Sequence, residues 1–259
     1  MRIAVCVKIV LANEESVEQL EHSRMIYPDR VSISEHDLLA LEFASDLARA
    51  TSSELCALSS GPSRLLSITR LQKEILARGA HSLYLFFDDA VKEQSSFSTA
   101  LYLSRCIREI GDIDLIICGD SAEDTIAGQT GVQLAELMDY PVLNNVRSCS
   151  INDFSLELLC EDLEYEDLYK VHCPAVVCIS SDCAKPRICS VTDIFGSAKK
   201  PVRVLDAESF HPGPKKEIAQ KQTTIYRAPN HKRGGKIISG VQSPVVFSSE
   251  LYTALEKVQ

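Results

Sequence analysis

Short apolar runs alternate with stretches of helical periodicity over the first 150 residues, and this alternation constrains the fold more than any other feature. The apolar runs predict strands at residues 3–7, 55–58, 83–87, 114–118 and 141–146. Between them, apolar residues recur at helical spacing, which predicts helices at residues 34–50, 63–78, 98–110 and 128–138. Strands that alternate with helices favour a parallel sheet covered on both faces. The sequence therefore predicts an α/β fold, a three-layer sandwich with a mostly parallel central sheet.

The pattern changes after residue 150. Residues 154–172 are typical of two antiparallel strands around an acidic turn, and an apolar strand follows at Ala175–Ile179. From about residue 201, turn-forming residues interrupt every candidate element: Pro201, Pro212, Gly213, Pro214, Pro229, Gly234 and Gly235. We therefore expect a folded domain over residues 1–200 and a C-terminal arm over residues 201–259.

The charge of the chain is uneven. The formal net charge is −9, which argues against a nucleic-acid-binding protein. Residues 211–236 nevertheless carry seven Lys or Arg and one acid, a charge of +6, which leaves −15 for the remainder. This basic segment predicts docking to an acidic partner or to the acidic body of the chain itself; a solvated tail is the alternative.

Nothing in the sequence indicates membrane insertion. No apolar stretch approaches the roughly 20 residues that a membrane-spanning helix needs. The apolar run at the N-terminus stops at Lys8, so it is typical of a buried strand rather than a signal peptide. Most of the ten cysteines lie inside apolar runs, which favours reduced, packed thiols and a cytoplasmic protein.

Two kinds of chemistry find little support. Cys173, Cys178, Cys183 and Cys189 have the spacing C-x4-C-x4-C-x5-C, and thiolates bind zinc or iron–sulfur clusters. The chain has no CxxC pair, however, so we predict packed or surface thiols and no metal. A Gly-x-Ser-x-Gly elbow is also missing from the sequence, and we predict no catalytic residue.

The loop after the fourth predicted strand is rich in small and hydrogen-bonding residues. Residues 117–131 read ICGDSAEDTIAGQTG, and the predicted helix follows. Free N–H groups at a helix start favour an anion, so the loop suits a phosphate group. A capped strand-to-helix turn explains the same residues. Ser59, Ser60, Gly61 and Pro62 also follow a predicted strand, and the two loops are candidates to share one site at the carboxyl ends of the strands.

Several further segments complete an ordered pattern. They read VCVKIV at residues 5–10, HDLLALEFA at 36–44, SSGP at 59–62, ARGA at 77–80, CGDSAEDTIAGQTGVQLAELMDYP at 118–141, CPAVVCIS at 173–180 and KPRICSVTDIFGSAKKPV at 185–202. In this order the segments resemble the β (small) subunit of electron transfer flavoproteins over residues 1 to about 200. The longest segment is the most specific, because it matches the family's Cys-Gly-x-x-Ala-x-Asp…Gln-x-Gly…Leu-Ala loop and helix.

The resemblance implies a Rossmann-like, adenine-nucleotide-binding domain that carries electrons and has no catalysis of its own. It implies a heterodimer with a larger α subunit, which holds most of the redox FAD and around which the C-terminal arm wraps. The β subunit itself binds AMP, or a second FAD in electron-bifurcating members; His36 and Asp37 favour the second FAD. The expected electron donor is an acyl-CoA-type or another flavoprotein dehydrogenase, which binds transiently.

Residues that match the family's motifs are the candidate site. They are Cys6, Ser34, Glu35, His36, Asp37, Ser60, Gly119, Asp120, Ser121, Ala122, Glu123, Asp124, Thr125, Ile126, Ala127, Gly128, Gln129 and Thr130. The resemblance implies that the loop surrounds the adenosine and directs its helix start toward a phosphate.

The chain departs from the family's pattern in several places. Asp120 stands where relatives often have a basic or neutral residue, and Ile126 where a second acid is frequent. The acidic hairpin at residues 160–165 lacks the family's arginine and glycines. Cys183 stands where a leucine often precedes the segment that contacts partner dehydrogenases. These changes indicate a divergent bacterial paralogue. The rival hypothesis is a stand-alone adenine-nucleotide-binding regulatory module of the universal-stress-protein type.

Overall fold

The computed structural model describes residues 1–11, 19–20, 23–24, 31–87, 89, 95–152, 155–161, 165–181, 183 and 185–206. All of them lie in the first of the chain's two compact units, Met1–Gly213. The elements are β1 (Arg2–Cys6), β2 (Ile9–Leu11), β3 (Gln19–Leu20), β4 (Ser23–Arg24), β5 (Val31–Ile33), α1 (Glu35–Thr51), β6 (Glu54–Gly61), α2 (Ser63–Leu66), α3 (Thr69–Ala77), β7 (Ser82–Phe87), α4 (Ser96–Ile110), β8 (Leu115–Gly119), α5 (Thr130–Met138), β9 (Val142–Asn152), β10 (Ser155–Glu161), β11 (Glu166–His172), β12 (Ala175–Ile179), α6 (Val191–Ser197) and β13 (Val202–Asp206).

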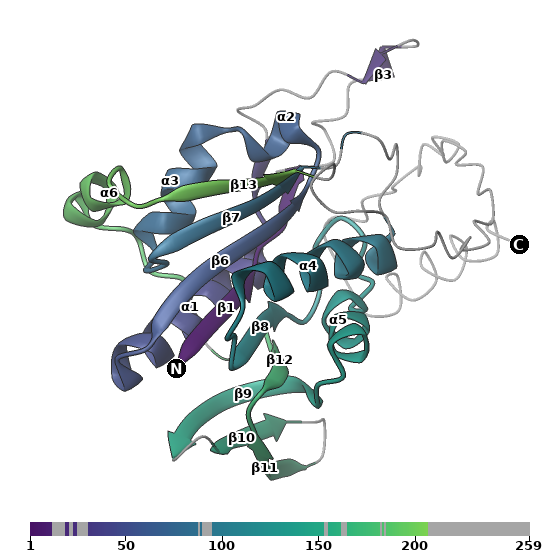
Figure 1. Ribbon diagram of the computed structural model, residues 1–259, viewed down its shortest axis with the longest axis vertical. Coiled ribbons are helices and arrows are strands. Elements are labelled where there is room, and N and C mark those ends of the chain that lie inside the picture. The colour runs from purple at the N-terminus through teal and green to yellow at the C-terminus, as the bar shows by residue number, and fades with distance from the viewer. Residues whose placement is uncertain are drawn as a thin grey trace, which may run out of the picture. The chain divides into compact units, whose positions relative to one another are not determined.

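A nine-stranded sheet with the order β11-β10-β9-β12-β8-β1-β6-β7-β13 forms the centre of the fold (Figure 1). Seven neighbouring strands of this sheet run parallel: β9, β12, β8, β1, β6, β7 and β13. β10 pairs antiparallel with β9 on one side and with β11 on the other. This confirms the predicted α/β fold with a mostly parallel sheet. The first strand, β1, lies in the interior of the sheet, because the chain adds β6 and β7 on one side of it and then returns to place β8 on the other.

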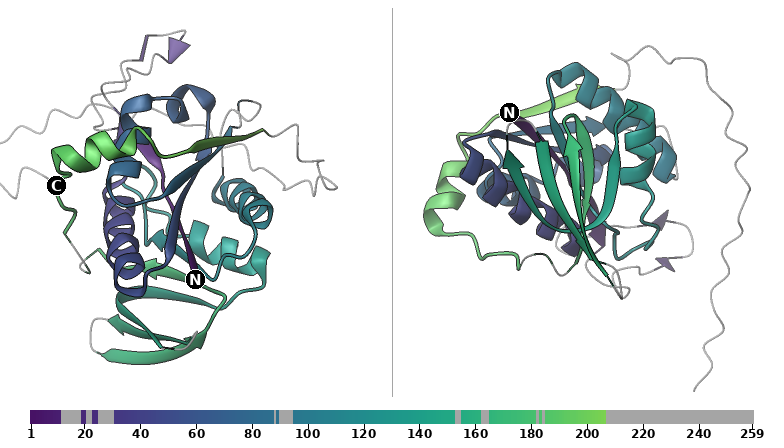
Figure 2. Two further views of the ribbon diagram at one scale, coloured as in Figure 1. Left: turned by 60° about the vertical axis from the view of Figure 1, so that its left-hand side comes forward. Right: turned by 90° about the horizontal axis from the view of Figure 1, so that it is seen from below.

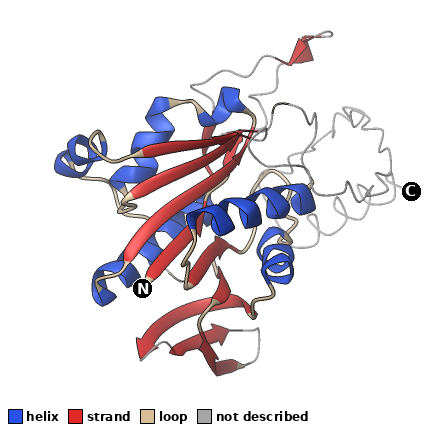
Figure 3. Ribbon diagram, viewed as in Figure 1, coloured by secondary structure: helices blue, strands red, loops and turns tan. Residues whose placement is uncertain are grey.

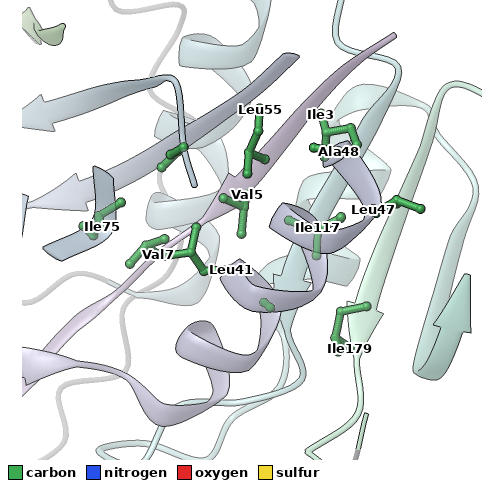
Figure 4. Close-up of a cluster of buried hydrophobic side chains, with 14 of the residues drawn as sticks. Ile3, Val5, Val7, Leu41, Leu47, Ala48, Leu55, Ile75, Ile117 and Ile179 are labelled. Atoms are coloured by element: carbon green, nitrogen blue, oxygen red, sulfur yellow. The ribbon is translucent and has the colours of Figure 1, made fainter. Parts of the chain in front are cut away.

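Helices cover both faces of the sheet, as Figures 2 and 3 show. One face packs against α1, α2 and α3 through a cluster that includes Val5, Leu41, Leu66, Ile75 and Ile117 (Figure 4). The other face packs against α4 and α5 through a second cluster that includes Leu103, Ile107 and Leu134. The interior strands are nearly continuous apolar runs because both of their faces are buried. These two clusters account for the three-layer arrangement.

The hairpin of residues 155–172 is confirmed as two antiparallel strands, β10 and β11, with Leu158 opposite Tyr169. The following strand, Ala175–Ile179, has the predicted bounds. β9 is longer than expected, because it continues to Asn152 and pairs with β10 as well as with β12. The antiparallel strands therefore extend one edge of the sheet.

Two local predictions need correction. The single helix expected at residues 63–78 is two helices, and the Gln72 side-chain amide donates a 2.7 Å hydrogen bond to the Leu66 carbonyl at the break. The helix expected from residue 128 begins at Thr130. Ser34 occupies the N-cap position of α1, but its hydroxyl makes no capping hydrogen bond.

Two elements near the end of the described chain were not expected. α6 begins with a reciprocal capping box between Ser190 and Asp193. β13 pairs with β7 at the edge of the sheet, so Val202–Asp206 belong to the central sheet although they lie beyond residue 200. The rest of the arm expected over residues 201–259, which is residues 207–259 with the basic segment 211–236, lies outside the described residues, as do residues 162–164 of the acidic turn. No helix in the described ranges has the length and apolar character needed to cross a membrane.

Candidate functional site

A cavity of about 360 Å³ opens at the carboxyl ends of β1, β6 and β8. It lies where the strand order reverses, between β1 and β8. Open α/β sheets bind ligands at this kind of position, because the helices that follow the two strands leave on opposite faces. The cavity is therefore the candidate functional site.

Many residues of the predicted site meet in this cavity. Its lining includes Cys6, Asp37, Ser60, Gly119, Asp120, Ser121, Ala122, Thr125, Ala127, Gly128, Gln129 and Thr130. The two loops after β6 and β8 thus contribute to one cavity. Six residues of the predicted set are absent from the lining: Ser34, Glu35, His36, Glu123, Asp124 and Ile126. Ile126 points away into solvent and is 76% exposed, with a left-handed φ of 48°.

Two helix N-termini border the cavity. α4 contributes Ser95, Ser96 and Thr99 from its first turn, and α5 contributes Gln129 and Thr130. Gln129 is the N-cap residue of α5 but does not cap its own helix; its Oε1 accepts a 3.2 Å hydrogen bond from Ser96 Oγ. The first backbone N–H groups of α5 consequently have no side-chain cap. Uncapped N–H groups and the helix dipole favour an anionic group at this end.

Glycines allow the loop to take its path. Gly128 has a φ of 59°, and a Cβ there would lie 3.1 Å from the Asp120 carbonyl oxygen. At Gly119 a Cβ would lie 2.7 Å from Asp37 Oδ1 and 2.9 Å from the His36 carbonyl carbon. The end of β8 therefore approaches the start of α1 more closely than any side chain permits.

The Asp37 carboxyl group is held by backbone hydrogen bonds at the base of the cavity. Its Oδ2 accepts a 2.7 Å hydrogen bond from the Lys8 backbone N–H, and the Gly119 N–H donates to the same carboxyl group. Burial raises the pKa of Asp37 to about 7, although these two hydrogen bonds act in the opposite direction. The carboxyl thus joins the ends of β1 and β8 through their backbones.

Three acids of the loop contact residues at the beginning of the chain. Lys8 Nζ lies 2.6 Å from Asp124 Oδ1, and His36 Nδ1 lies 2.6 Å from Asp120 Oδ1. The Glu35 backbone N–H donates to Glu123. The loop acids are therefore engaged with the segments around β1 and α1, which reduces the repulsion that an anionic ligand meets.

Thiols form part of the cavity floor. Cys6 and Cys118 lie at the ends of neighbouring strands, and Cys178 is paired with Cys118 one strand further. The hydrogen bond with Cys6 and burial raise the pKa of the Cys118 thiol, and burial raises that of Cys178. The Cys118 and Cys178 thiols are therefore protonated at neutral pH and behave as small apolar side chains. Among the described residues, no group of three or more His, Cys, Asp or Glu is arranged to hold a metal ion.

Sequence reasoning missed several residues of the cavity. Lys8 follows the first strand directly, and Ser95, Ser96 and Thr99 begin α4. The serine-rich run at residues 95–98 is an N-cap signal at a strand-to-helix connection, and it was available in the sequence. Only the folded sheet, however, brings this helix start beside the loop after β8.

A second feature lies at the opposite end of the described chain. Ile188, Val191, Ile194 and Phe195, in and before α6, are all at least half exposed. Cys183, by contrast, packs against the core. Among the described residues of this region, the large apolar side chains exposed to solvent come after the Pro186–Arg187 turn.

A comparison with known protein families adds one finding. The family model described as "Electron transfer flavoprotein domain" matches residues 28–209, which is more than two thirds of the 259 residues. The match includes the strands β6, β7, β8 and β12, the loop after β8 and the whole of α6.

Proposed function

The chain belongs to the electron transfer flavoprotein domain family, and from this premise we propose that it is the β-type subunit of a heterodimer with a larger α subunit. Proteins of this family carry electrons and are not classical enzymes. In the proposed complex the α subunit holds most of the redox FAD, and this chain binds an adenine nucleotide. A family match of this extent does not favour a stand-alone regulatory module.

The observation that carries the proposal is the cavity between β1 and β8. Its volume of about 360 Å³ is near the lower end of the range for small-molecule sites. This size suits AMP or the AMP half of a second FAD better than an entire dinucleotide. The buried hydroxyl oxygens of Ser60 and Ser121 have no hydrogen-bond partner in the part of the chain that the structure describes, which fits a polar ligand in this place.

Each part of the cavity has a role in this proposal. The uncapped N–H groups at the start of α5 bind the phosphate, and Ser60 and Ser121 offer hydrogen bonds to the ribose or the base. The thiols of Cys6 and Cys118 form an apolar floor for the ring. A bound flavin supplies reversible uptake of electrons, whereas the protein positions the cofactor and sets its electrostatic surroundings.

The exposed segment around α6 is the proposed docking surface for a flavoprotein dehydrogenase. Val191, Ile194 and Phe195 offer apolar side chains within a single short helix. Exposed apolar anchors of this kind contribute most of the energy of a transient interface. We place the contact with an acyl-CoA-type or another flavoprotein dehydrogenase here.

The proposal is tested by counting the nucleotide. The purified complex is denatured, and released AMP and FAD are quantified per chain; we expect one AMP, or one FAD beyond that of the α subunit. Gly128→Val adds a branched side chain at a left-handed position beside the loop carbonyl, so bound nucleotide should fall well below one per chain. Full nucleotide content in this variant would sink the assignment of the cavity.

Gly111→Val is the matched control. Gly111 also has a left-handed φ, 69°, but a Cβ there meets nothing within 4 Å, and it lies at the end of α4 far along the chain from the loop. This variant also places a branched side chain at a positive φ, but away from the cavity, and should keep its nucleotide.

A further inference from the structure

The segment of residues 185–200 connects β12 to β13 and carries α6, which lies beside α3 in Figure 1. Of the seven residues of α6 only Ser197 is buried, and Phe195 is 75% exposed. A helix this short is not stable on its own in water. Contacts outside the helix must therefore hold it in place.

The first set of contacts holds Arg187, which directly precedes the exposed Ile188. Arg187 Nη1 lies 3.5 Å from Oε1 of Glu42, and the Arg187 backbone N–H donates a 3.4 Å hydrogen bond to Oε2 of the same carboxylate. Glu42 belongs to α1 and is 95% buried. From the end of α3, Arg78 Nη1 donates a 2.9 Å hydrogen bond to the Arg187 carbonyl. Two helices of the body thus hold the same residue.

The second set of contacts lies at the other end of the segment. Lys200 Nζ donates 2.7 Å hydrogen bonds to the carbonyl oxygens of Leu76 and Ala80, at the end of α3. Between the two ends, the capping box of Ser190 and Asp193 fixes the start of α6. The segment is fastened by polar contacts on both sides of its apolar residues.

α6 packs beside α3, so the polar contacts matter most on the side of the segment that faces α1. A cavity of about 510 Å³ separates α6 from the last turns of α1, with Ser45 and Ala48 on one side and Asp193 and Gly196 on the other. Glu42 and Arg187 join α1 to the segment across this side. Loss of the Glu42 charge leaves the Arg187 guanidinium without its buried partner.

We propose that Glu42, Arg78 and Arg187 are positioning residues for partner docking: they hold the segment of residues 185–200 so that the apolar side chains of α6 form an ordered surface before any partner binds. The inference rests on the proposed function of α6 as the docking surface. A surface that is ordered in advance loses less conformational entropy on association. Loosening the contacts therefore weakens docking and leaves the electron-transfer step itself unchanged.

The experiment compares Glu42→Gln with Asp46→Asn in the full chain, purified as the flavin-containing complex. Both variants remove one carboxylate from α1 and one ion pair with an arginine, but Asp46 is exposed and its ion pair is with Arg49 of the same helix. Hydrogen exchange of a peptide covering residues 188–199 reports the order of the segment, and a peptide covering residues 128–138 reports the nucleotide site. We expect exchange in the first peptide to rise about tenfold in Glu42→Gln only, because opening of the segment becomes more frequent.

Steady-state electron transfer supplies the second measurement, with an acyl-CoA dehydrogenase reduced by its acyl-CoA as the donor. We expect Glu42→Gln to raise KM for the complex about tenfold at unchanged kcat and unchanged nucleotide content, since only docking is weakened. A purely structural role would instead lower Tm and nucleotide content and leave KM as it is. Unchanged exchange, or an unchanged KM, would overturn the inference.

Phe195→Ser separates this inference from the proposed function. If Phe195→Ser raises KM and Glu42→Gln does not, the docking surface stands and the positioning role is overturned. If neither variant changes KM although exchange rises in Glu42→Gln, docking at α6 is overturned. If the unaltered complex accepts no electrons from this donor, the proposed donor is overturned, and the exchange measurement alone then decides whether the contacts order the segment.

Discussion

Asp37 lies buried in the first turn of α1, where its carboxyl group accepts backbone hydrogen bonds from Lys8 and Gly119. Lys8 directs its ammonium group to Asp124 instead. Burial therefore outweighs the favourable contacts, and the pKa of Asp37 is raised from 3.8 to about 7. A single buried carboxyl group thus makes the stability of the chain depend on pH.

The sign of that dependence follows from proton linkage. Between pH 4 and pH 7 the native state holds a proton on Asp37 that the unfolded state has lost, so the free energy of unfolding falls as pH rises through this range. A shift of this size corresponds to about 4 kcal/mol, fully present below pH 4 and lost above pH 7. Asp37→Asn has no such proton, and its stability should lack this component.

Urea unfolding of the nucleotide-free chain at pH 5, 6, 7 and 8 measures the effect. We expect the stability of the unaltered chain to decline with pH more steeply than that of Asp37→Asn, while Asp46→Asn, an exposed carboxylate on the same helix, keeps the full slope. Parallel pH profiles for Asp37→Asn and the unaltered chain would show that Asp37 titrates at an ordinary pKa.

At the scale of elements, α5 reaches the sheet only because Gly131 has no side chain. A Cβ at Gly131 would collide with Cys178 Sγ and lie 3.5 Å from Cys118 Cβ. The first turn of α5 is therefore seated on the thiols of two neighbouring strands. This close approach places the N-terminus of the helix at the cavity.

A double-mutant cycle tests the contact. Gly131→Ala should destabilise the chain by about 1–3 kcal/mol, because the added methyl group overpacks the interface. Cys178→Ala removes the sulfur and should cost about 1–2 kcal/mol on its own. In combination the two changes should cost less than their sum, since the alanine methyl occupies the space of the thiol.

Thermal or urea unfolding of the four proteins gives the coupling energy. Gly131→Ala combined with Cys56→Ala is the control pair, because Cys56 is equally buried in the same cluster but lies on β6. If the losses of stability caused by Gly131→Ala and Cys178→Ala are additive, the position of α5 does not depend on contact with the Cys178 thiol.

At the scale of the whole molecule, an acidic body is joined to a basic C-terminal segment. Residues 211–236 carry a charge of +6 against −15 for the rest of the chain. The C-terminal arm of residues 201–259 also contains apolar residues such as Ile225, Ile237 and Phe247. Its many prolines and glycines interrupt any helical or strand periodicity, so these apolar residues are not expected to form a core of their own. We expect this arm to bury its apolar residues on the α subunit.

Truncation after Asp206 tests the arm and leaves β13 complete. The truncated chain should fold and bind nucleotide, because every described element ends at or before this residue. It should fail to co-purify stably with the α subunit. For the full chain, association should weaken as salt rises, since charge contributes to it. A tight flavin-containing heterodimer formed by the truncated chain at moderate salt would contradict the proposed role.

Sequence alone determined the features that depend on neighbours along the chain. The strands β1, β6, β7, β8 and β12 follow from local apolar runs, and α1 and α4 from helical periodicity with a glycine or a change of pattern at their ends. The loop at residues 119–130 was predicted to be a binding site from its small and polar residues and from the family resemblance. Local composition suffices in these cases, because an apolar period has to match the geometry of the element that buries it.

Only the tertiary structure decided which segments meet. The return of the chain from β7 to the far side of β1 brings the start of α4 beside the loop after β8, so that Ser96 contacts Gln129. The same holds for Glu42 and Arg187, which are 145 positions apart and have no local signal that relates them. Strand order and long-range polar contacts depend on how all the apolar faces are buried together. Local sequence patterns carry no information on which of the possible arrangements buries them best.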